Sequence, residues 1–341
     1  RRQRQMCIRD RAAVVTGAGR GIGKGHALQL AKAGASVVVN DVDADVAQEV
    51  VDEIEGFGGT AIANTDSVAE KAGADAIVAA CVEAFDKIDI MMANAGIVRD
   101  RTFLKMTEEE FDAVINVHVK GTFLCHQAAA LSMKEAGSGG VLLSTVSAAH
   151  FGNFGQTNYA GAKGAIASMT YTLAMELARY GIRVNAISPS GTTRMSDTYI
   201  GPDGKKHPMP YIDPELNGPM LVYLCSDEGN YISGQIFGTG GERISILNQP
   251  SYGHTLLMPG GWTIGGTGFG EMLPIHDNRM WIDEDRTDAW GLPVPAFDCT
   301  LGENERLMRV DMANDMAEML EAAGVRDVET WEGEYLSLIH I

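Results

Sequence analysis

Cysteine is scarce in this sequence, and the spacing of its few cysteines excludes two kinds of stabilised domain. Cys7, Cys81, Cys125, Cys225 and Cys299 are far apart, odd in number and never spaced as a CxxC pair. A disulfide framework uses an even number of cysteines, and structural zinc sites use closely spaced pairs. We therefore expect buried thiols in a reducing compartment, with no disulfide framework and no metal site.

Positive charge is also in short supply. The 27 Lys and Arg residues stand against 45 Asp and Glu, which gives a formal net charge of −18 at pH 7. A nucleic-acid backbone and an anionic membrane surface both attract clusters of Lys and Arg. We therefore expect neither nucleic acid nor a membrane as a partner.

Long apolar runs are missing as well. No run reaches the roughly 18 apolar residues that a transmembrane helix needs. The N-terminal stretch RRQRQMCIRDR has no hydrophobic segment behind it that would serve as a signal peptide. Together these features predict a cytoplasmic protein. Glycine, with 40 residues, is the one excess, and it favours tight turns or phosphate-binding loops.

Between residue 12 and about residue 240, short β-branched runs alternate with longer segments of helical periodicity. This alternation is typical of a parallel sheet that is covered by helices on both faces. The predicted strands are 12–16, 36–40, 60–63, 88–93, 140–145, 183–188 and 234–238. The predicted helices are 22–33, 43–55, 70–85, 107–116, 120–136, 157–180 and 214–226. We expect an α/β fold, a Rossmann-type doubly wound parallel sheet of about seven strands.

The segment 191–213 interrupts this alternation. It is rich in Gly, Pro and Met, has no clear period and follows the sixth predicted strand. In open α/β sheets the ligand crevice lies beyond the carboxyl ends of the strands. We therefore predict that this segment is a mobile loop at the substrate.

The motif TGAGRGIG at 16–23 follows the first predicted strand and opens the first predicted helix. Gly17 allows the sharp turn, while Gly21 and Gly23 let the backbone approach a dinucleotide and the helix pack on the sheet. The pyrophosphate would then lie at the N-terminus of the helix. Taken alone, the motif is also compatible with a glycine-rich turn that binds no ligand.

Asp41 ends the second predicted strand, where its carboxylate can accept hydrogen bonds from the hydroxyls of an adenosine ribose. The same carboxylate would repel a 2′-phosphate, so the position favours NAD over NADP. Arg20 in the glycine turn can partly offset that repulsion. Asp41 is equally compatible with a simple helix N-cap in the run NDVDAD.

Tyr159 and Lys163 stand four residues apart in NYAGAK, at the start of a predicted helix. This spacing places both side chains on one face of the helix, about a turn apart. A nearby ammonium stabilises a phenolate and brings the pKa of the tyrosine toward the working range. The pair is therefore a candidate for exchanging a proton with a substrate oxygen, although such pairs also occur on solvated helices.

Five motifs share the order and spacing of the short-chain dehydrogenase/reductase family, which the sequence resembles over about residues 12–264. They are TGAGRGIG, Asp41, NAG at 94–96, YAGAK at 159–163 and ISPSGTTRM at 187–195. The resemblance implies a homodimer or homotetramer that moves a hydride between a nicotinamide and a secondary alcohol or ketone. The cofactor-binding residues that it implies are Gly17, Arg20, Gly21, Ile22, Gly23, Asp41, Asp66, Asn94, Ala95, Gly96, Tyr159, Lys163, Pro189 and Thr192.

The same resemblance implies roles within that set. Tyr159 would be the catalytic acid/base, and Lys163 would bind the nicotinamide ribose and act on the tyrosine. Asn94 would support the adenosine side and Asp66 would lie near the adenine. Thr192 would follow the strand that meets the carboxamide.

His118 marks a first departure from the family pattern. It occupies, in VINVHVKGTF, the place of the usual asparagine that holds a proton-relay water. A histidine can donate, accept or relay a proton near neutral pH, so we interpret His118 as a catalytic variant, against the alternative of a histidine merely packed on the helix. With GNFGQTNY at 152–159 it is similar to the dehydrogenase domain of peroxisomal multifunctional enzyme type 2, which acts on 3-hydroxyacyl-CoA.

The serine that polarises the substrate oxygen is the second departure. Val146 stands where the family has this serine, thirteen residues before the tyrosine. Ser147 would reach the site if the loop after the fifth strand is one residue shorter. Ser144, which is still on the strand, is the alternative, and we favour Ser147.

The chain ends differ in character from the rest. Residues 265–335 resemble a fragment of the substrate domain of glucose-methanol-choline oxidoreductases, without that family's FAD-binding glycine loop, so we expect no FAD. One helix is predicted there at 304–323. The termini MCIRDR at 6–11 and LSLIHI at 336–341 resemble translated sequencing-adapter sequence, so residues 1–11 and 336–341 are taken as non-native tails. The predicted domain therefore spans residues 12–264.

Two hypotheses follow from the sequence. The first is an NAD-dependent dehydrogenase of a secondary alcohol, with 3-hydroxyacyl-CoA as the favoured substrate class. The second is a non-catalytic dinucleotide-binding protein from a fused or chimeric gene. A separation of about 3–4 Å between Ser147 Oγ and Tyr159 Oη would favour the first.

Overall fold

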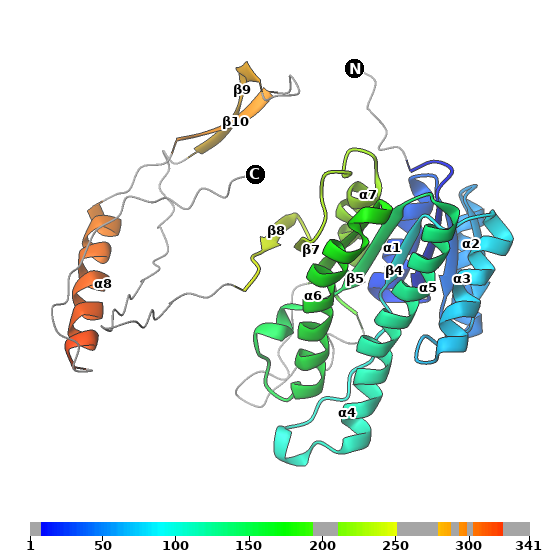
Figure 1. Ribbon diagram of the computed structural model, residues 1–341, viewed down its shortest axis with the longest axis horizontal. Coiled ribbons are helices and arrows are strands. Elements are labelled where there is room, and N and C mark those ends of the chain that lie inside the picture. The colour runs from blue at the N-terminus through cyan, green and yellow to red at the C-terminus, as the bar shows by residue number, and fades with distance from the viewer. Residues whose placement is uncertain (1–7, 194–210, 251–278, 288–292, 299–302, 323–341) are drawn as a thin grey trace. The chain divides into compact units, whose positions relative to one another are not determined.

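The structure is a computed structural model that describes residues 8–193, 211–250, 279–287, 293–298 and 303–322 (Figure 1). The chain divides into two compact units, Arg1–Asn248 and Gln249–Ile341. The first unit contains one sheet, whose strands are β1 Ala12–Thr16, β2 Ser36–Asn40, β3 Thr60–Asn64, β4 Ile90–Ala93, β5 Gly140–Thr145, β6 Ile182–Pro189, β7 Ile236–Gly240 and β8 Arg243–Leu247. Its α-helices are α1 Gly21–Lys32, α2 Ala44–Gly56, α3 Lys71–Phe85, α4 Glu108–Ile115, α5 Gly121–Ala136, α6 Thr157–Leu177 and α7 Gly218–Cys225.

The strands lie in the order β3-β2-β1-β4-β5-β6-β7-β8. Strands β1 to β7 pair in parallel, and β8 runs antiparallel to β7. The order reverses between β1 and β4, which are neighbours although β2 and β3 separate them in sequence. In such sheets a ligand crevice forms at this point, beyond the carboxyl ends of the strands.

Successive residues of β1 point to opposite faces of the sheet. Ala13 and Val15 are buried with apolar residues of α1, α2 and α7, while Ala12 and Val14 are buried with residues of α3 and α5 (Figure 1). Both faces of the strand are therefore covered, which explains its nearly continuous apolar sequence. The prediction of a sheet between two helical layers is confirmed.

The seven predicted strands are all present, with ends that differ by up to two residues. The eighth strand, β8, was not predicted, so the sheet is mixed and not purely parallel. Gly240 and Gly241 have positive φ angles of 133° and 59°, which let the chain reverse tightly after β7. Since β8 is an edge strand with mostly exposed side chains, it lacks the apolar run by which the buried strands were recognised.

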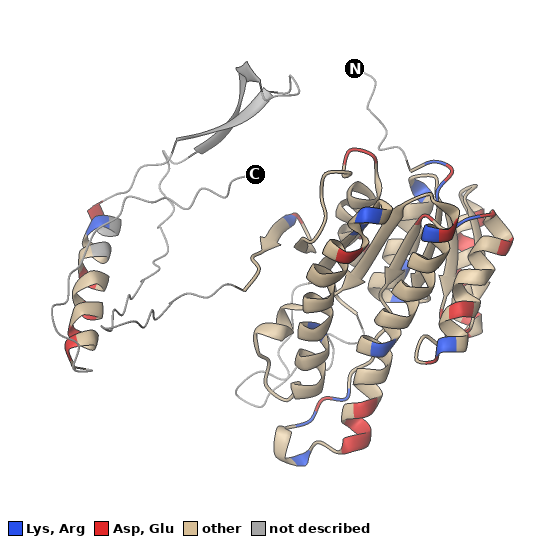
Figure 2. Cartoon of the chain, in the orientation of Figure 1, with Lys and Arg blue, Asp and Glu red and all other residues tan. Residues whose placement is uncertain are grey.

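Helices α4 and α5 were predicted as separate, but the structure joins them through a π-helical turn, η2 Asn116–Lys120. A π turn is wider than an α turn, so the 3.6-residue period breaks without any loop residue to mark the change. Helix α4 begins with a capping box between Thr107 and Glu110. Figure 2 shows the acidic residues of its first turn, which interact favourably with the positive end of the helix dipole.

Residues 8–11, assigned above to a non-native tail, pack on the first unit. The Ile8 side chain is fully buried in the core. The Arg11 guanidinium lies 2.6 Å from the Asp227 carboxylate, and the Arg11 carbonyl accepts a hydrogen bond from the Ser36 N–H. Residues 8–11 therefore pack with the first unit, and their assignment to a non-native tail stays a prediction.

The C-terminal boundary was predicted near residue 264, whereas the first unit ends at Asn248. Residues 251–278, which contain the predicted boundary, lie outside the described residues. In the second unit β9 Arg279–Thr287 and β10 Pro293–Asp298 form an antiparallel pair, and α8 Glu303–Ala322 matches the helix predicted at 304–323.

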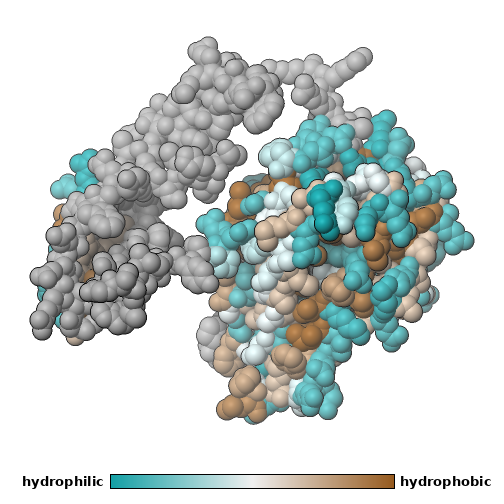
Figure 3. All heavy atoms as spheres, viewed as in Figure 1, coloured by the Kyte–Doolittle hydropathy of each residue, from teal (hydrophilic) through white to brown (hydrophobic). Residues whose placement is uncertain are grey.

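The cysteines, membrane spans and metal-ligating groups are considered for the described residues only. Cys81, Cys125 and Cys225 are free and buried. None of the helices in this part of the chain combines the length and hydropathy of a membrane span. No group of three or more metal-ligating side chains is found there either. The visible surface of the first unit mixes hydrophilic and apolar residues (Figure 3).

Candidate active site

The glycine turn after β1 is packed so closely that side chains are excluded. A Cβ on Gly17, whose φ is +60°, would lie 2.8 Å from the Ala95 Cα. A Cβ on Gly23 would lie 2.1 Å from the Gly17 carbonyl oxygen. Arg20, the N-cap of α1, makes no side-chain capping hydrogen bond, and the N-terminus of a helix is a favourable place for an anion. These features fit the pyrophosphate of a dinucleotide.

Asn94, at the end of β4, fastens this turn to the sheet. Its side-chain amide donates to the carbonyls of Thr16 and Gly17 at 3.1 and 3.2 Å, and its Oδ1 accepts from Thr145 Oγ1 at 3.1 Å. Thr16 Oγ1 in turn accepts the N–H groups of Asn94 and Ala95. Thr16 and Thr145 were not predicted, because a threonine at the end of a buried strand carries no distinct signal of its own.

Asp41 lies directly after β2 and faces the glycine turn. Its carboxylate accepts the N–H groups of Gly19 and Asp43, both at 3.1 Å. The Arg20 guanidinium instead lies 2.6 Å from Asp43, and hydrogen bonding to Arg20 lowers the pKa of that carboxyl group. The charge of Arg20 is thus balanced by Asp43, which leaves Asp41 as the acidic group at the turn.

Asp66 follows β3, the neighbour of β2 in the sheet. Its carboxylate accepts a hydrogen bond from Asn64 Nδ2 at 2.8 Å, and its carbonyl accepts one from Asn40 Nδ2 at 2.9 Å. Because Asn40 and Asn64 are aligned across β2 and β3, Asp41 and Asp66 follow neighbouring strands at the same edge. That edge is where the adenosine half of a dinucleotide would lie.

Tyr159 and Lys163 occupy the first turns of α6. Lys163 is only 2% exposed, and its Nζ donates to the Thr145 carbonyl at 2.6 Å. The Nζ lies 5.5 Å from the centroid of the Tyr159 ring. Burial lowers the pKa of Lys163 to about 7. The lysine is therefore fixed beside the tyrosine, at the end of β5.

The pKa of Tyr159 differs from the sequence-based expectation. Burial raises this pKa, a hydrogen bond with Ser147 lowers it, and the Asp100 carboxylate raises it. Loss of hydration disfavours the phenolate, and this effect is the largest. The sequence predicts that Lys163 lowers the pKa of Tyr159, but in this structure the pKa of Tyr159 is raised.

Ser147 is the second residue beyond β5 and the N-cap of a short helix, η3 Ala148–Phe151. Its hydroxyl accepts the Ala149 N–H at 3.2 Å and lies close enough to Tyr159 to lower the pKa of that tyrosine. Ser144 is 1% exposed within β5, and the Val146 side chain is fully buried in the core. The geometry therefore favours Ser147 as the serine that meets the tyrosine.

His118 lies in the π-helical turn, with its ring edge against Tyr159 at a centroid distance of 5.3 Å and an angle of 88°. Its Nε2 lies 3.0 Å from the Ile97 nitrogen and 2.8 Å from the Ile97 carbonyl oxygen. A Cβ on Gly96 would lie 2.3 Å from this ring, so the glycine is needed here.

The charge state of His118 bears on its predicted role in proton transfer. Burial, and then the charge of Lys163, lower the pKa of His118 to about 3. The imidazole is therefore neutral at pH 7, so it can pass a proton on but does not titrate near neutrality. Its buried Nδ1 has no hydrogen-bond partner among the described residues.

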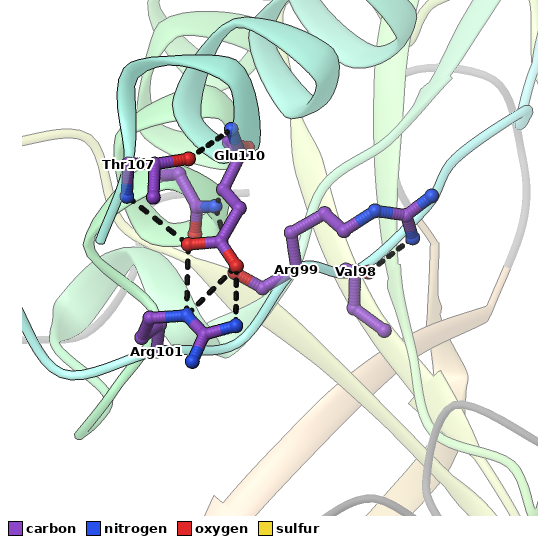
Figure 4. A network of polar contacts seen from close by, with 6 residues as sticks. Val98, Arg99, Arg101, Thr107 and Glu110 are labelled. Carbon is purple, nitrogen blue, oxygen red and sulfur yellow. Dashed lines mark hydrogen bonds and ion pairs between the residues drawn. The ribbon is translucent and has the colours of Figure 1, made fainter. Parts of the chain in front are cut away.

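Asn158, which precedes Tyr159, was not predicted as a site residue. It is fully buried, donates to the carbonyls of Arg99 and Glu110 at 3.0 and 3.2 Å, and accepts the Tyr159 N–H at 2.8 Å. Figure 4 shows the same segment, where Arg101 forms an ion pair with Glu110. Asn158 thus joins the start of α6 to the loop after β4. These partners are distant in sequence, so no local pattern revealed them.

The last predicted cofactor contacts lie at the end of β6 and just after it. Pro189 is aligned with Thr239 of β7, and Thr192 exchanges two hydrogen bonds with the backbone of Ile212. Gly191 packs against Ile22 of α1, which brings this segment beside the glycine turn. Most of the loop predicted at 191–213, namely residues 194–210, lies outside the described residues.

Comparison with known proteins places this geometry in a wider context. A family model described as short chain dehydrogenase matches residues 11–200. A short-chain type dehydrogenase/reductase of Mycobacterium tuberculosis is 42% identical over 230 residues, which are 65% of this chain and 79% of that protein. A hydroxyacyl-CoA dehydrogenase of the same species is 38% identical over 258 residues, which are 71% of this chain and 81% of that protein.

Peroxisomal and structural relatives extend the comparison. The peroxisomal multifunctional enzyme type 2 of Mus musculus is 37% identical over 246 residues, which are 70% of this chain but only 32% of that enzyme. The solved structure of a 7α-hydroxysteroid dehydrogenase, complexed with NADH and 7-oxo glycochenodeoxycholic acid, has a TM-score of 0.61 and 31% identity and covers 70% of this chain and 96% of its own. These matches give no support to the resemblance of residues 265–335 to glucose-methanol-choline oxidoreductases.

Proposed function

The chain belongs to the short-chain dehydrogenase/reductase family, and from that premise we propose that it oxidises a 3-hydroxyacyl-CoA to the 3-ketoacyl thioester with NAD. Enzymes of this family depend on NAD or NADP and act on CH–OH groups. The observation that carries the proposal is the buried Lys163 on α6, whose Nζ lies 5.5 Å from the centroid of the Tyr159 ring one turn earlier. A non-catalytic dinucleotide-binding protein would not need this arrangement.

The residues fit a dinucleotide, whose nicotinamide would supply the hydride acceptor. Ser147 then donates a hydrogen bond to the substrate oxygen and orients it toward Tyr159. As the phenolate, Tyr159 takes the hydroxyl proton while the carbonyl forms. The Lys163 side chain beside the ring, in its protonated form, opposes the effect of burial that disfavours this phenolate. The neutral imidazole of His118 supports Tyr159 from the side and holds Ile97 in place.

NAD is the proposed cofactor because of the charges around the glycine turn. Asp41 presents a carboxylate there, while the positive charge of Arg20 is balanced by Asp43. A 2′-phosphate placed at about 4 Å from Asp41 would be repelled by about 1–4 kcal/mol at effective dielectrics of 80 to 20. The NADH in the hydroxysteroid dehydrogenase structure is consistent with this choice.

The substrate class is inferred from relatives. One relative is described as a hydroxyacyl-CoA dehydrogenase, and the peroxisomal enzymes contain a similar domain. The hydroxysteroid dehydrogenase supports a second candidate, a hydroxysteroid, which offers the same secondary alcohol on a polycyclic body. The chemistry at Tyr159 is the same for both.

Assembly and location are part of the proposal. We expect a homodimer or homotetramer in the cytoplasm. Phe123 and Leu131 on α5 and Met175 on α6 are exposed apolar side chains on neighbouring helices, which a second copy would cover.

The test is an assay of the full chain with NAD, in which absorbance follows the formation of NADH. We expect oxidation of 3-hydroxyacyl-CoA to exceed that of hydroxysteroids and simple secondary alcohols. The variant Tyr159→Phe should retain NAD affinity but lose roughly two to four orders of magnitude in turnover, because it removes proton transfer and not binding. Turnover within about tenfold of the unaltered protein would refute the assigned role.

A further inference from the structure

Two loops at the candidate active site are joined into one unit. They follow β4 and β5, and we call residues 98–106 and 147–156 the loop pair. The Arg101 N–H donates to the Gly155 carbonyl at 2.8 Å, and Gln156 Nε2 donates to the Asp100 carboxylate at 2.9 Å. The buried amide of Asn158 adds a hydrogen bond to the Arg99 carbonyl. The two loops therefore hold a common position beside Tyr159.

The loop pair exposes four large apolar side chains. Phe103 and Phe151 are each 71% exposed, Phe154 is 79% exposed and Leu104 is 94% exposed. Figure 3 shows apolar residues at the lower end of the first unit, the end toward which α4 extends in Figure 1. Isolated apolar residues are common on surfaces, but a group gathered on two joined loops indicates a binding surface.

The polar groups of the loop pair are largely occupied by one another or by α4. The Arg101 guanidinium is held by the Glu110 carboxylate (Figure 4), and Asn153 donates to the Gln156 side chain, which itself donates to Asp100. Apart from the exposed cationic side chains of Arg99 and Lys105, the loop pair offers a ligand mainly apolar surface. A small, polar alcohol would gain little from such a surface.

The loop pair is also continuous with the proposed catalytic residues. Ser147 is the first residue of the second loop, and it caps the short helix η3, which ends at Phe151. Phe154 lies five residues before Tyr159. Both loops begin at the carboxyl ends of strands that are neighbours in the sheet, where ligands of such folds bind.

We propose that the loop pair binds the apolar part of the substrate, so that the enzyme selects hydroxyacyl thioesters with a long chain over those with a short one. This inference rests on the proposed function and specifies its substrate. Burial of each additional methylene contributes up to about fourfold in affinity. The preference should therefore grow with chain length until the chain passes the last apolar side chain.

The experiment compares kcat/KM for 3-hydroxybutanoyl-CoA, 3-hydroxydecanoyl-CoA and 3-hydroxyhexadecanoyl-CoA with NAD. The variants are Phe151→Ser, Phe154→Ser and the double variant, and the control is Phe57→Ser, which alters an exposed phenylalanine at the end of α2. The double variant should lose roughly tenfold or more for the two longer substrates and less than about twofold for the shortest. The control Phe57→Ser should leave kcat/KM unchanged for all three substrates.

Three outcomes would overturn the inference. An unchanged ratio of long to short substrate in the double variant would separate the loop pair from chain recognition while leaving the proposed function intact. A shift in oligomeric state without a change in that ratio would assign the surface to a second copy of the chain. Absence of activity with every hydroxyacyl-CoA in the unaltered protein would remove the proposed function itself. If the double variant does not fold, the single variants give the same comparison.

Discussion

At the scale of single residues, Val146 and Ser147 show how one position along a loop decides which side chain reaches the site. Val146 continues the ladder of β5 through a hydrogen bond to the Ile187 carbonyl, and its side chain is buried with Ile166 and Ile236. Ser147 is the next residue, outside the strand, and it lowers the pKa of Tyr159. The sequence left Ser144 as an alternative, because an apolar pattern does not fix the end of a strand to one residue.

Substitution of the two serines separates their roles. Ser147→Ala should lower kcat by roughly 10²–10³, since it removes a donor to the oxygen where charge develops. Ser144→Ala should cost less than about tenfold, because Ser144 lies within the sheet. Steady-state kinetics of both variants, with thermal unfolding as a control for folding, checks the ranking. A larger loss for Ser144→Ala would transfer the polarising role to that residue.

Buried histidines make the stability of the first unit dependent on pH. Burial lowers the pKa of His26 to about 3, of His118 to about 3 and of His126 to about 4. Below the ordinary pKa of 6.5 the unfolded chain binds protons that the folded protein does not, so stability is lost as pH falls. At pH 5 each histidine costs about 2 kcal/mol, against a typical total of about 5–15 kcal/mol. Lys163 adds little to this slope, because at acidic pH it is protonated in both states.

The variant His26→Leu tests this dependence. Both ring nitrogens of His26 are buried without hydrogen-bond partners among the described residues, so an apolar side chain removes the titration without breaking a bond. The melting temperature of the unaltered protein should fall between pH 7 and pH 5, and that of the variant should fall less. Parallel slopes for the two proteins would contradict the assignment.

At the scale of helices and strands, the sequence predicted those elements whose signals come from residues close together in the chain. Each βα unit has its own apolar run, its own turn and its own periodic helix, so seven strands and the order of the motifs followed from local patterns. The joining of α4 to α5 by η2 and the pairing of the exposed strand β8 did not, because a π turn and an edge strand lack those patterns.

The residues of the candidate site likewise fall into those that short motifs predict and those that only the fold brings together. Tyr159, Lys163 and the glycines of the turn belong to short motifs and were proposed directly from them. The contacts of Asn158 with Arg99 and Glu110 span about fifty residues, and only the fold brings these groups together. The raised pKa of Tyr159 also depends on burial, which no spacing of residues reveals.

The end of β2 is the element that should set cofactor choice. The double substitution Asp41→Ser with Val42→Arg should shrink or reverse the preference for NAD, because it replaces a repulsive charge by an attractive one. Arg20→Ala should leave the preference in place, since Arg20 is already paired with Asp43. The ratio of kcat/KM for NAD and NADP measures both effects. Equal efficiency with the two cofactors in the unaltered protein would contradict the role of Asp41.

At the scale of the whole molecule, the two units differ in what they contribute. All of the proposed catalytic and cofactor-binding residues lie between Gly17 and Thr192, and the sheet is complete at Leu247. The structured N-terminus also belongs to the first unit, since Ile8 is buried in its core. We therefore expect the first unit to be sufficient for dinucleotide binding.

We expect a shortened chain of residues 1–250 to bind NAD and unfold cooperatively. Its core lies on both faces of the sheet and is built from the strands and helices of the first unit. The described part of the second unit consists of one strand pair and one helix, which is little secondary structure on which to build a core of its own. Calorimetric titration with NAD and thermal unfolding, each beside the full chain, provide the comparison. An insoluble product, or a loss of NAD affinity beyond about tenfold, which is about 1.4 kcal/mol, would make residues 251–341 part of the working fold.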